Sequence, residues 1–306
     1  MPNTPDQRIN QRVAELSKDP DLIQILTQSF APGIHGSEKI KLAILYHLVG
    51  GVPKERNGLT SRGALHVLLI GDPGTGKTQI LQFAQTLCDA VLVTGTGVNS
   101  DGFAATVTID QTGSPTILEG ALAKADNKHL HIDKLDKLNS ELIPVLETAM
   151  EQQIYPIAKN GVTTSLNTRI SLLAASNPTL GRYNSYQTIS QNINLPVGIL
   201  TCFDLIFILR DYPDEETDRR IAEKILEIKT CRYEEESIID LTLLKLYIAT
   251  ASQIQPTIPR ESKNRIRDFY IDIRRASEDG GAITITPRQL ISLIRIAEAH
   301  AKLHLR

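Results

Sequence analysis

The stretch that most constrains the fold of this 306-residue chain is a glycine-rich turn at residues 71–76. An apolar run precedes the turn and apolar residues at helical spacing follow it, which predicts a buried strand, a tight turn and a helix. Gly71, Gly76, Lys77 and Thr78 fit the pattern G-x-x-x-x-G-K-[ST]. In such a turn, backbone N–H groups surround phosphate oxygens, and the helix N-terminus attracts the same anion. We therefore predict a phosphate-binding loop.

The loop implies a nucleotide and a magnesium ion as cofactors. Lys77 would place its charge near the β- and γ-phosphates, and the hydroxyl of Thr78 would coordinate Mg²⁺. A chance glycine turn is the alternative, but it would not require the strand and the helix that flank this one. We expect ATP or ADP to bind with Mg²⁺ through the following residues: Gly71, Asp72, Pro73, Gly74, Thr75, Gly76, Lys77 and Thr78.

The overall charge gives no broad attraction to nucleic acid or to anionic membranes. The net charge is −2, with 41% hydrophobic and 22% charged residues, as in an ordinary globular protein. Three scattered cysteines indicate a reducing compartment and no disulfide framework. No apolar run is long enough to span a membrane, and residues 1–5 lack the features of a signal peptide. We expect an intracellular protein in which any contact with DNA is local or is repeated over several subunits.

Apolar runs and helical segments alternate through the middle of the chain. The predicted strands lie near residues 65–70, 90–94, 129–133, 170–175 and 205–209. With helices between most of them, they predict an α/β fold with a five-stranded parallel sheet flanked by helices. Helices are predicted at 6–30 with a break near 19–21, and at 34–48, 141–153, 215–228, 238–253, 261–277 and 287–304. The predicted domains are a helical lead-in at 1–62, a nucleotide-binding core at 63–212 and a small all-helical lid at 213–306.

Three connecting segments carry further local signals. Residues 54–62 are predicted as a polar loop, and residues 95–102 contain too much glycine for a regular element. Two β-rich runs, at 154–158 and 162–166, flank Asn160-Gly161, the strongest short signal for a β-hairpin. The hairpin would place Lys159 at or near its tip, where a solvated lysine without a special role is the simpler interpretation.

Polar residues end two of the predicted strands. Asp133 ends the third, where a carboxylate can hold the Mg²⁺ shell, and Asn177 follows the fourth, at the edge where parallel sheets bind ligands. His129, His131 and Asp133 would share one strand face, which superficially suggests a metal site. Strand alternation explains this pattern and no further ligands are evident. We expect Thr78 and Asp133 to act on Mg²⁺ through the nucleotide, without a dedicated metal site.

Several further stretches resemble one family, the AAA+ motor of the minichromosome maintenance (MCM) replicative DNA helicases. The resemblance covers about residues 12–305, in the order APGIHG (31–36), GGVPK (50–54), GDPGT (71–75), AMEQQ (149–153), IAKNG (157–161), GRY (181–183), NINLP (192–196) and FDLIF (203–207). It implies the P-loop AAA+ fold and a lid that carries sensor 2. It also implies a homo-oligomer or a mixed ring with MCM-family subunits around single- or double-stranded DNA. The expected location is a prokaryotic cytoplasm, near the nucleoid, or a eukaryotic nucleus.

The resemblance also implies roles for single residues. Asp133 would be the Walker B carboxylate, and Asn177 would be sensor 1, which polarises the attacking water. Arg288 would be sensor 2, which reaches the active site of a neighbouring subunit. Lys159 would contact DNA phosphates from the presensor hairpin, and residues 95–102 would form the helix-2 insert at the channel. One lysine repeated around a ring would let a chain of net charge −2 bind DNA.

Two positions depart from the family pattern. Lys134 stands in place of the catalytic glutamate, and a lysine offers no carboxylate to orient the attacking water. Asp136 is the nearest other acid, but the family has it too, in another role. Cys202 stands in place of the arginine finger, which contributes about 10³–10⁵ to the rate in comparable systems. No supporting histidine and acid are evident around Cys202, so we expect a packed cysteine and not a nucleophile.

The sequence therefore supports three hypotheses. The first is an ATP-binding module that contacts DNA and has weak or absent hydrolysis, as an assembly subunit, a regulatory subunit or a vestigial copy. The second is an active DNA helicase motor that obtains the missing acid and arginine elsewhere. The third is an interaction module that no longer binds nucleotide. An ATP-binding titration separates the third from the others, and a turnover assay with single-stranded DNA separates the first two.

Overall fold

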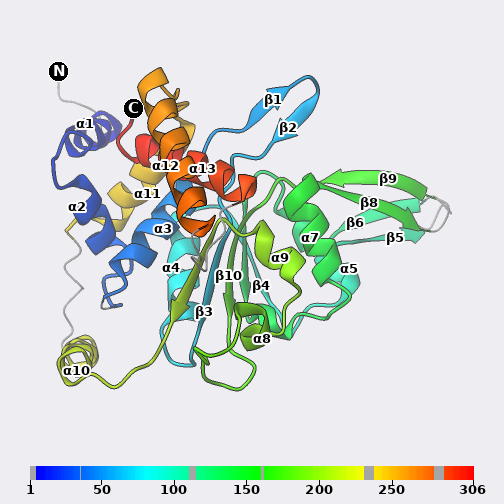
Figure 1. Cartoon of the computed structure of the whole chain (residues 1–306), viewed down its shortest axis with the longest axis horizontal. Helices are drawn as coiled ribbons and strands as arrows, with labels where there is room; N and C mark the ends of the chain where they lie inside the picture. Colours follow the sequence, from blue (N-terminus) through cyan, green and yellow to red (C-terminus); the bar gives the residue numbers. More distant parts are fainter. Residues whose placement is uncertain (1–4, 35, 110–114, 160–161, 231–237, 279–285) are drawn as a thin grey trace.

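A computed structural model describes residues 5–34, 36–109, 115–159, 162–230, 238–278 and 286–306. At its centre, five parallel strands form one sheet between layers of helices (Figure 1). In order across the sheet, the strands are β11 (Leu205–Leu209), β3 (Val67–Gly71), β10 (Ser171–Ser176), β7 (His129–Asp133) and β4 (Ala90–Thr94). Each lies where the sequence predicted a strand, so the predicted α/β fold is confirmed.

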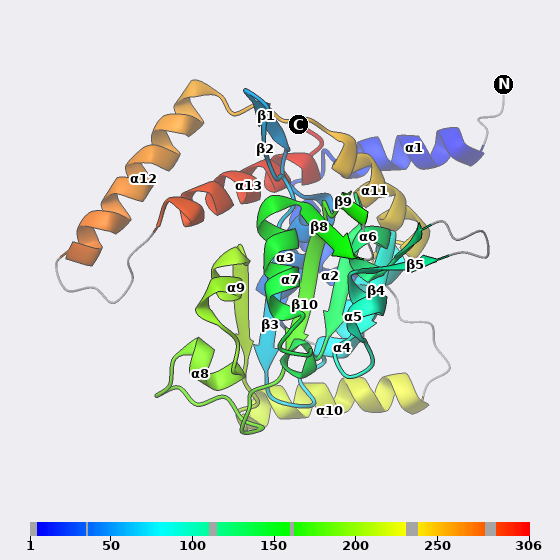
Figure 2. The same ribbon diagram turned by 90° about the vertical axis from the view of Figure 1, so that its right-hand side faces the viewer.

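Helices cover both faces of the sheet, because its central strands are apolar on both sides. Val67 and Leu69 of β3 join one hydrophobic cluster, whereas Leu68 and Ile70 join the other, as strand alternation requires. The first cluster takes in α1 (Pro5–Leu16), α2 (Leu22–Ser29), α3 (Glu38–Val49) and α4 (Lys77–Leu87). The second takes in α6 (Ala121–Lys124), α7 (Ile143–Gln152), α8 (Ile189–Ile193) and α9 (Val197–Cys202) (Figure 2).

The N-terminal region departs from the prediction at two places. The helix expected from residue 34 begins at Glu38, because Ser37 before it has a left-handed backbone (φ 60°). Residues 54–61, expected to be a polar loop, form an antiparallel hairpin of β1 (Lys54–Arg56) and β2 (Leu59–Ser61). Its turn residues Asn57 and Gly58 have φ of 54° and 75°. The Asn-Gly hairpin signal was therefore present in the sequence but was missed.

Two further hairpins project together from one end of the sheet (Figure 1). They are β5–β6 (Ala105–Ile109 and Pro115–Glu119) and β8–β9 (Ile154–Lys159 and Val162–Asn167). Ala105, Val107 and Ile157 form a small hydrophobic cluster between them. The predicted hairpin β8–β9 is confirmed, although its tip residues 160–161 lie outside the described residues.

The expectation that residues 95–102 form no regular element is wrong in part. A short helix, α5 (Ser100–Phe103), begins within them, and its N-cap Asn99 accepts a hydrogen bond from the Gly102 N–H at 2.8 Å. The projecting hairpin that follows is β5–β6, which the sequence did not predict. The polar side chain of Asn99 supplies the local N-terminal cap that this glycine-rich segment needed to form a helical turn.

The predicted C-terminal helical lid is confirmed, while its start at residue 213 stays a prediction. Among the described residues after position 213 there are four helices. They are α10 (Glu215–Thr230), α11 (Leu241–Gln253), α12 (Arg260–Glu278) and α13 (Pro287–Leu303). Tyr247 of α11 is fully buried and donates from its hydroxyl to the Leu303 carbonyl of α13 at 2.6 Å. Both α11 and α13 pack against α3, so much of the lid shares one core with the N-terminal helices.

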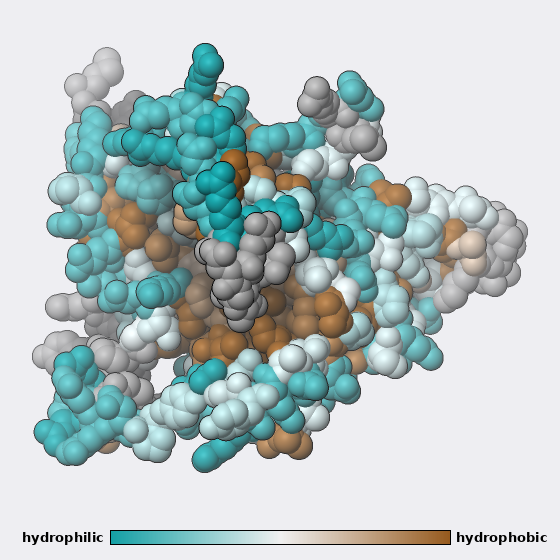
Figure 3. Space-filling view, viewed as in Figure 1, coloured by the Kyte–Doolittle hydropathy of each residue, from teal (hydrophilic) through white to brown (hydrophobic). Residues whose placement is uncertain are grey.

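On the face seen in Figure 1, hydrophilic side chains cover the helical layers, and apolar ones gather in the hollowed middle of the face (Figure 3). None of the helices in the described part of the chain is long and apolar enough to cross a membrane.

One buried carboxylate, that of Asp204, joins the lid to the core. It accepts hydrogen bonds from Arg62 of the core at 2.8 Å, from Arg295 of α13 at 2.7 Å and from Ser292 of α13 at 2.5 Å. The backbone N–H of His66 donates to it as well, at 2.8 Å. Because two guanidinium groups surround one carboxylate whose side chain is 1% exposed, α13 is held firmly at this edge of the core.

Candidate functional site

The predicted phosphate-binding loop lines a cleft of about 310 Å³ at the carboxyl ends of β3, β7 and β10. Its lining consists of Pro73, Gly74, Thr75, Gly76, Lys77, Thr78, Gln79, Asp133, Lys134, Ala175, Ser176 and Asn177. The parallel sheet thus brings together residues from three separate strand ends, as the sequence predicted for Asp133 and Asn177.

The glycines of the loop are required by its backbone. Gly74 and Gly76 have φ of 88° and 79°, in the left-handed region that other residues rarely adopt. Gly71 has a different reason, because a Cβ there would collide with the carbonyl oxygen of Leu209 on the neighbouring strand β11. The loop can therefore leave β3 only where a glycine ends that strand.

Lys77 lies inside the loop rather than extending into solvent. Its ammonium group donates to the carbonyl oxygens of Gly71 and Asp72, both at 2.7 Å, and to the Thr75 hydroxyl at 3.2 Å. Burial lowers the pKa of Lys77, and the nearby carboxylates oppose that change. The Lys77 ammonium group is thus a cation at the N-terminus of α4, and both the cation and the helix N-terminus favour a bound anion.

Thr78 and Asp133 meet at the edge of the cleft, and they fit a magnesium ion. The Thr78 hydroxyl donates to the Asp133 carboxylate, 3.1 Å from one oxygen and 3.3 Å from the other. A hydroxyl and a carboxylate are hard oxygen ligands, of the kind that Mg²⁺ accepts beside phosphate oxygens. The pair joins the first turn of α4 to the end of β7, so it depends on the register of the sheet.

Behind the cleft, the side chain of Asp136 is already engaged. It accepts a hydrogen bond from the backbone N–H of Asn177 at 2.9 Å and lies 3.6 Å from the Lys137 ammonium. Lys134, between Asp133 and Asp136, lines the cleft with a left-handed backbone (φ 57°). The Asp136 carboxylate therefore holds the Asn177 backbone in place.

Asp72 has a role that the sequence did not reveal. Its side chain turns toward two other loops, accepting from the backbone N–H of Tyr183 at 2.8 Å and of Asp211 at 3.1 Å. It is 8% exposed. Asp72 therefore ties the phosphate-binding loop to the segments after β10 and β11, a long-range function that local pattern cannot show.

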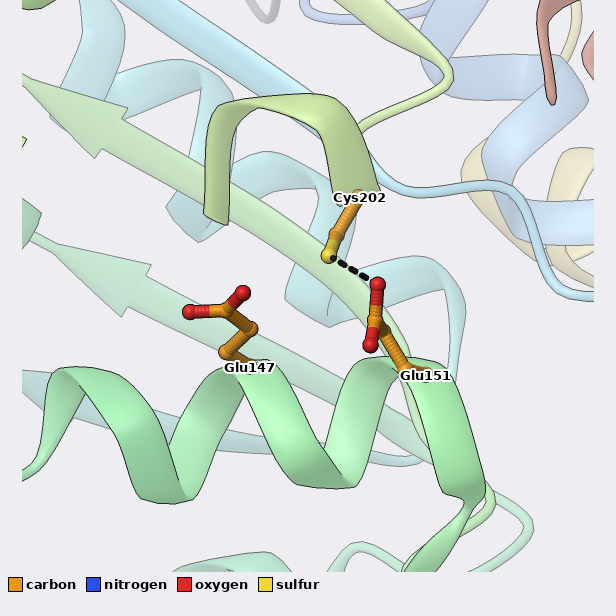
Figure 4. A group of neighbouring side chains, drawn as sticks. All are labelled: Glu147, Glu151 and Cys202. Atoms are coloured by element: carbon orange, nitrogen blue, oxygen red, sulfur yellow. Dashed lines mark hydrogen bonds between the residues drawn. The ribbon is translucent and has the colours of Figure 1, made fainter. Parts of the chain in front are cut away.

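Arg288 and Cys202 do not line the cleft but lie together beside α7. Arg288 donates from one guanidinium nitrogen to Glu151 and from the other to the Thr201 hydroxyl at 2.8 Å. Cys202 donates from Sγ to the same Glu151 oxygen at 3.6 Å (Figure 4). Burial, followed by the charge of Glu151, raises the pKa of the Cys202 thiol to about 11. This is a packed, protonated cysteine, as expected.

Among the described residues, Glu147, Glu151 and Cys202 form the group whose ligand atoms lie close enough to share a metal ion (Figure 4). Arg288 already neutralises Glu151, and the thiol is held protonated, so the arrangement is explained without an ion. It contains neither His129 nor His131.

The two histidines of β7, the partly buried His129 and the buried His131, lie next to a third, the buried His47 of α3. The ring centroid of His47 lies 5.0 Å from that of His129 and 6.0 Å from that of His131. Burial lowers the pKa of all three, and that of His131 falls to about 3. Asp133, predicted on the same strand face, contacts Thr78 instead. The structure therefore gives no support to a metal site formed by His129, His131 and Asp133.

Lys159 is the last residue of β8 and pairs with Val162 across the hairpin. It lies on the projecting hairpin and not at the cleft, as the sequence predicted.

Comparison with known proteins agrees with this geometry. Residues 9–229 match the family described as MCM P-loop domain, and residues 242–306 match MCM AAA-lid domain. Minichromosome maintenance protein MCM of Saccharolobus solfataricus is 43% identical over 300 residues, which cover 96% of this chain and 43% of that protein. DNA replication licensing factor MCM4 of Arabidopsis thaliana is 38% identical over 97% of this chain and 36% of its own length. DNA replication licensing factor mcm7 of Xenopus tropicalis is 37% identical over 93% and 40%.

The chain thus spans less than half the length of these relatives. Both family matches lie in the expected order, with the cleft in the first and Arg288 in the second. The chain belongs to the MCM family and contains its P-loop domain followed by its AAA-lid domain.

Proposed function

We propose that this chain is an ATP-binding MCM motor module with weak or absent hydrolysis of its own. The observation that carries the proposal is the arrangement of Lys77, Thr78 and Asp133 in one cleft at the end of the sheet. A lysine ammonium, a helix N-terminus and a hydroxyl–carboxylate pair match the triphosphate and its Mg²⁺. Thr78 and Asp133 would hold the ion, which would supply positive charge to neutralise the phosphates.

A second cleft supports binding of the whole nucleotide. It measures about 810 Å³ and is lined in part by Pro32, Ile34 and Phe207. Ile34 also lies beside the phosphate-binding loop, since a Cβ at Gly76 would be 3.8 Å from it. An apolar cleft of this kind, next to a phosphate site, suits the flat base of a nucleotide.

Weak hydrolysis is proposed from Lys134 and Cys202. Lys134 lines the cleft but has no carboxylate to orient water, and Asp136 is engaged with the Asn177 backbone. Cys202 lies away from the cleft, next to Arg288. That separation suits a site formed between two subunits, in which Arg288 would act on the neighbour's nucleotide. Without an arginine at position 202, the junction would lack one charge of its transition-state clamp.

The first test is ATP binding, measured by calorimetry. Replacing Lys77 with alanine removes a charge-assisted contact worth about 1.5–3 kcal/mol, so the affinity should fall about 10-fold to 100-fold or more. Lys128→Ala, which alters an exposed lysine paired with Asp89, is the matched control and should bind as the unaltered chain does. Absence of binding by the unaltered chain at millimolar ATP would favour an interaction module instead.

The second test is steady-state hydrolysis with single-stranded DNA. We expect negligible turnover in the unaltered chain and little gain from Lys134→Glu or Cys202→Arg alone. Because both changes act on one transition state, the double variant should gain disproportionately. Robust hydrolysis by the unaltered chain, lost in Lys77→Ala, would instead favour an active helicase motor.

A third test concerns DNA, which we propose is contacted by Lys159 on the projecting hairpin. The salt dependence of DNA binding should fall by about one unit in log–log slope per engaged copy in Lys159→Ala. Lys263→Ala, on the exposed helix α12, should leave the slope unchanged. An unchanged slope in Lys159→Ala would place any DNA contact elsewhere.

A further inference from the structure

The carboxylate of Glu151, at the end of α7, accepts hydrogen bonds from two side chains that come from α9 and α13. Arg288 and Cys202 both donate to its Oε1 atom. Figure 4 shows the contact with Cys202. The second terminal nitrogen of Arg288 donates to the Thr201 hydroxyl at 2.8 Å. Two acceptors on different helices fix both arms of the guanidinium group, so its plane as well as its position is set by the core.

We propose that Glu151 is the positioning residue of Arg288, fixing it on its own subunit at the surface from which it would act on a neighbour. This inference rests on the proposed function, because it assigns to Arg288 a role in a shared site. Among the described residues, Arg288 is the cation paired with Glu151. The thiol of Cys202 brings no charge, so the whole attraction of the carboxylate falls on Arg288.

Holding the lid in place is a separate task, and other residues perform it. Arg295 and Ser292 of the same helix α13 are fixed by the buried Asp204. The Arg288 and Glu151 side chains are 55% and 36% exposed. An ion pair this exposed contributes little to the stability of a fold. Loss of Glu151 should therefore free the guanidinium group without releasing α13.

The thiol of Cys202 reports on this contact, because the charge of Glu151 raises its pKa and the charge of Arg288 lowers it. The assay follows alkylation of the peptide containing Cys202 by mass spectrometry across a pH range. It compares the unaltered chain, Arg288→Gln, Glu151→Gln and the double variant. Arg288→Gln should raise the midpoint in the unaltered chain, and this effect should be largely lost when Glu151 is glutamine.

Glu147→Gln is the matched control, since Glu147 lies one helical turn earlier and also faces Cys202 (Figure 4). The charge of Glu147 also raises the pKa of the Cys202 thiol. Even so, Arg288→Gln should still shift the alkylation midpoint in the Glu147→Gln variant. An Arg288 effect of the same size in the presence and absence of Glu151 would overturn the proposal.

The thiol is alkylated without nucleotide turnover, so this cycle decides the role of Glu151 whether or not the proposed catalytic assignments hold.

Discussion

Replacing Asp204 with asparagine should destabilise the junction of core and lid. The carboxylate is almost fully buried and lies between Arg62 and Arg295, with Ser292 donating to the same oxygen as Arg295. Asparagine keeps the shape of the side chain but removes its negative charge and replaces one acceptor with a donor. The two guanidinium groups would then face each other without the anion between them.

The structure sets the size of this effect. Breaking a buried ion pair by removing one partner costs about 3–5 kcal/mol. Here the side chains of Arg62 and Arg295 are only 13% and 10% exposed, but both also donate to backbone carbonyls. Those hydrogen bonds to carbonyl groups survive the change, so we expect a loss of unfolding free energy at the lower end of this range, about 3 kcal/mol. That is a large part of the about 5–15 kcal/mol by which a domain is ordinarily stable.

Urea unfolding measures the change, followed by circular dichroism and by the fluorescence of the eight tyrosines, since the chain has no tryptophan. Agreement of the two probes checks that the transition is two-state. Glu261→Gln is the matched control, because Glu261 and Arg265 form an ion pair that is about 80% exposed on both sides. The control should cost about 0.3–0.5 kcal/mol. A loss in Asp204→Asn no larger than in this control would refute the reasoning.

Three further predictions follow from burial and close packing. The folded chain keeps His131 neutral down to a pKa of about 3, against 6.5 when unfolded, so the unfolded state binds more protons between these values. Stability should fall by about 1.4 kcal/mol from this residue between pH 7.5 and 5.5, as urea midpoints would show, and His131→Leu should remove that part. Gly95→Ala should weaken ATP binding in a titration, because the added Cβ collides with the Lys134 carbonyl, whereas Gly97→Ala should not. Burial raises the pKa of Cys88 to about 12, so its alkylation at pH 8 should be about 10³-fold slower than that of free cysteine, by peptide mass spectrometry.

The sequence predicted those parts of the site that depend on neighbours in the chain. The phosphate-binding loop was readable because glycine φ values, the lysine and the helix start all lie within a few residues of one another. Asp133 and Asn177 were found for a related reason, since the carboxyl ends of parallel strands must meet at one edge. The missed hairpin at Asn57-Gly58 belongs to this class too, because its signal was local.

The tertiary structure alone decided which side chains meet across the chain. Glu151 and Arg288 are 137 residues apart, and Asp204 takes partners from residue 62 to residue 295. The engagement of Asp72 with Tyr183 likewise depends on where a distant loop packs. Periodicity and composition fix which face of an element is buried, but a carboxylate pairs with whichever donor the packed helices bring within hydrogen-bond reach. The apolar pattern therefore determined the sheet and the loop at its edge, while the packing of α7, α9 and α13 determined where Arg288 is held.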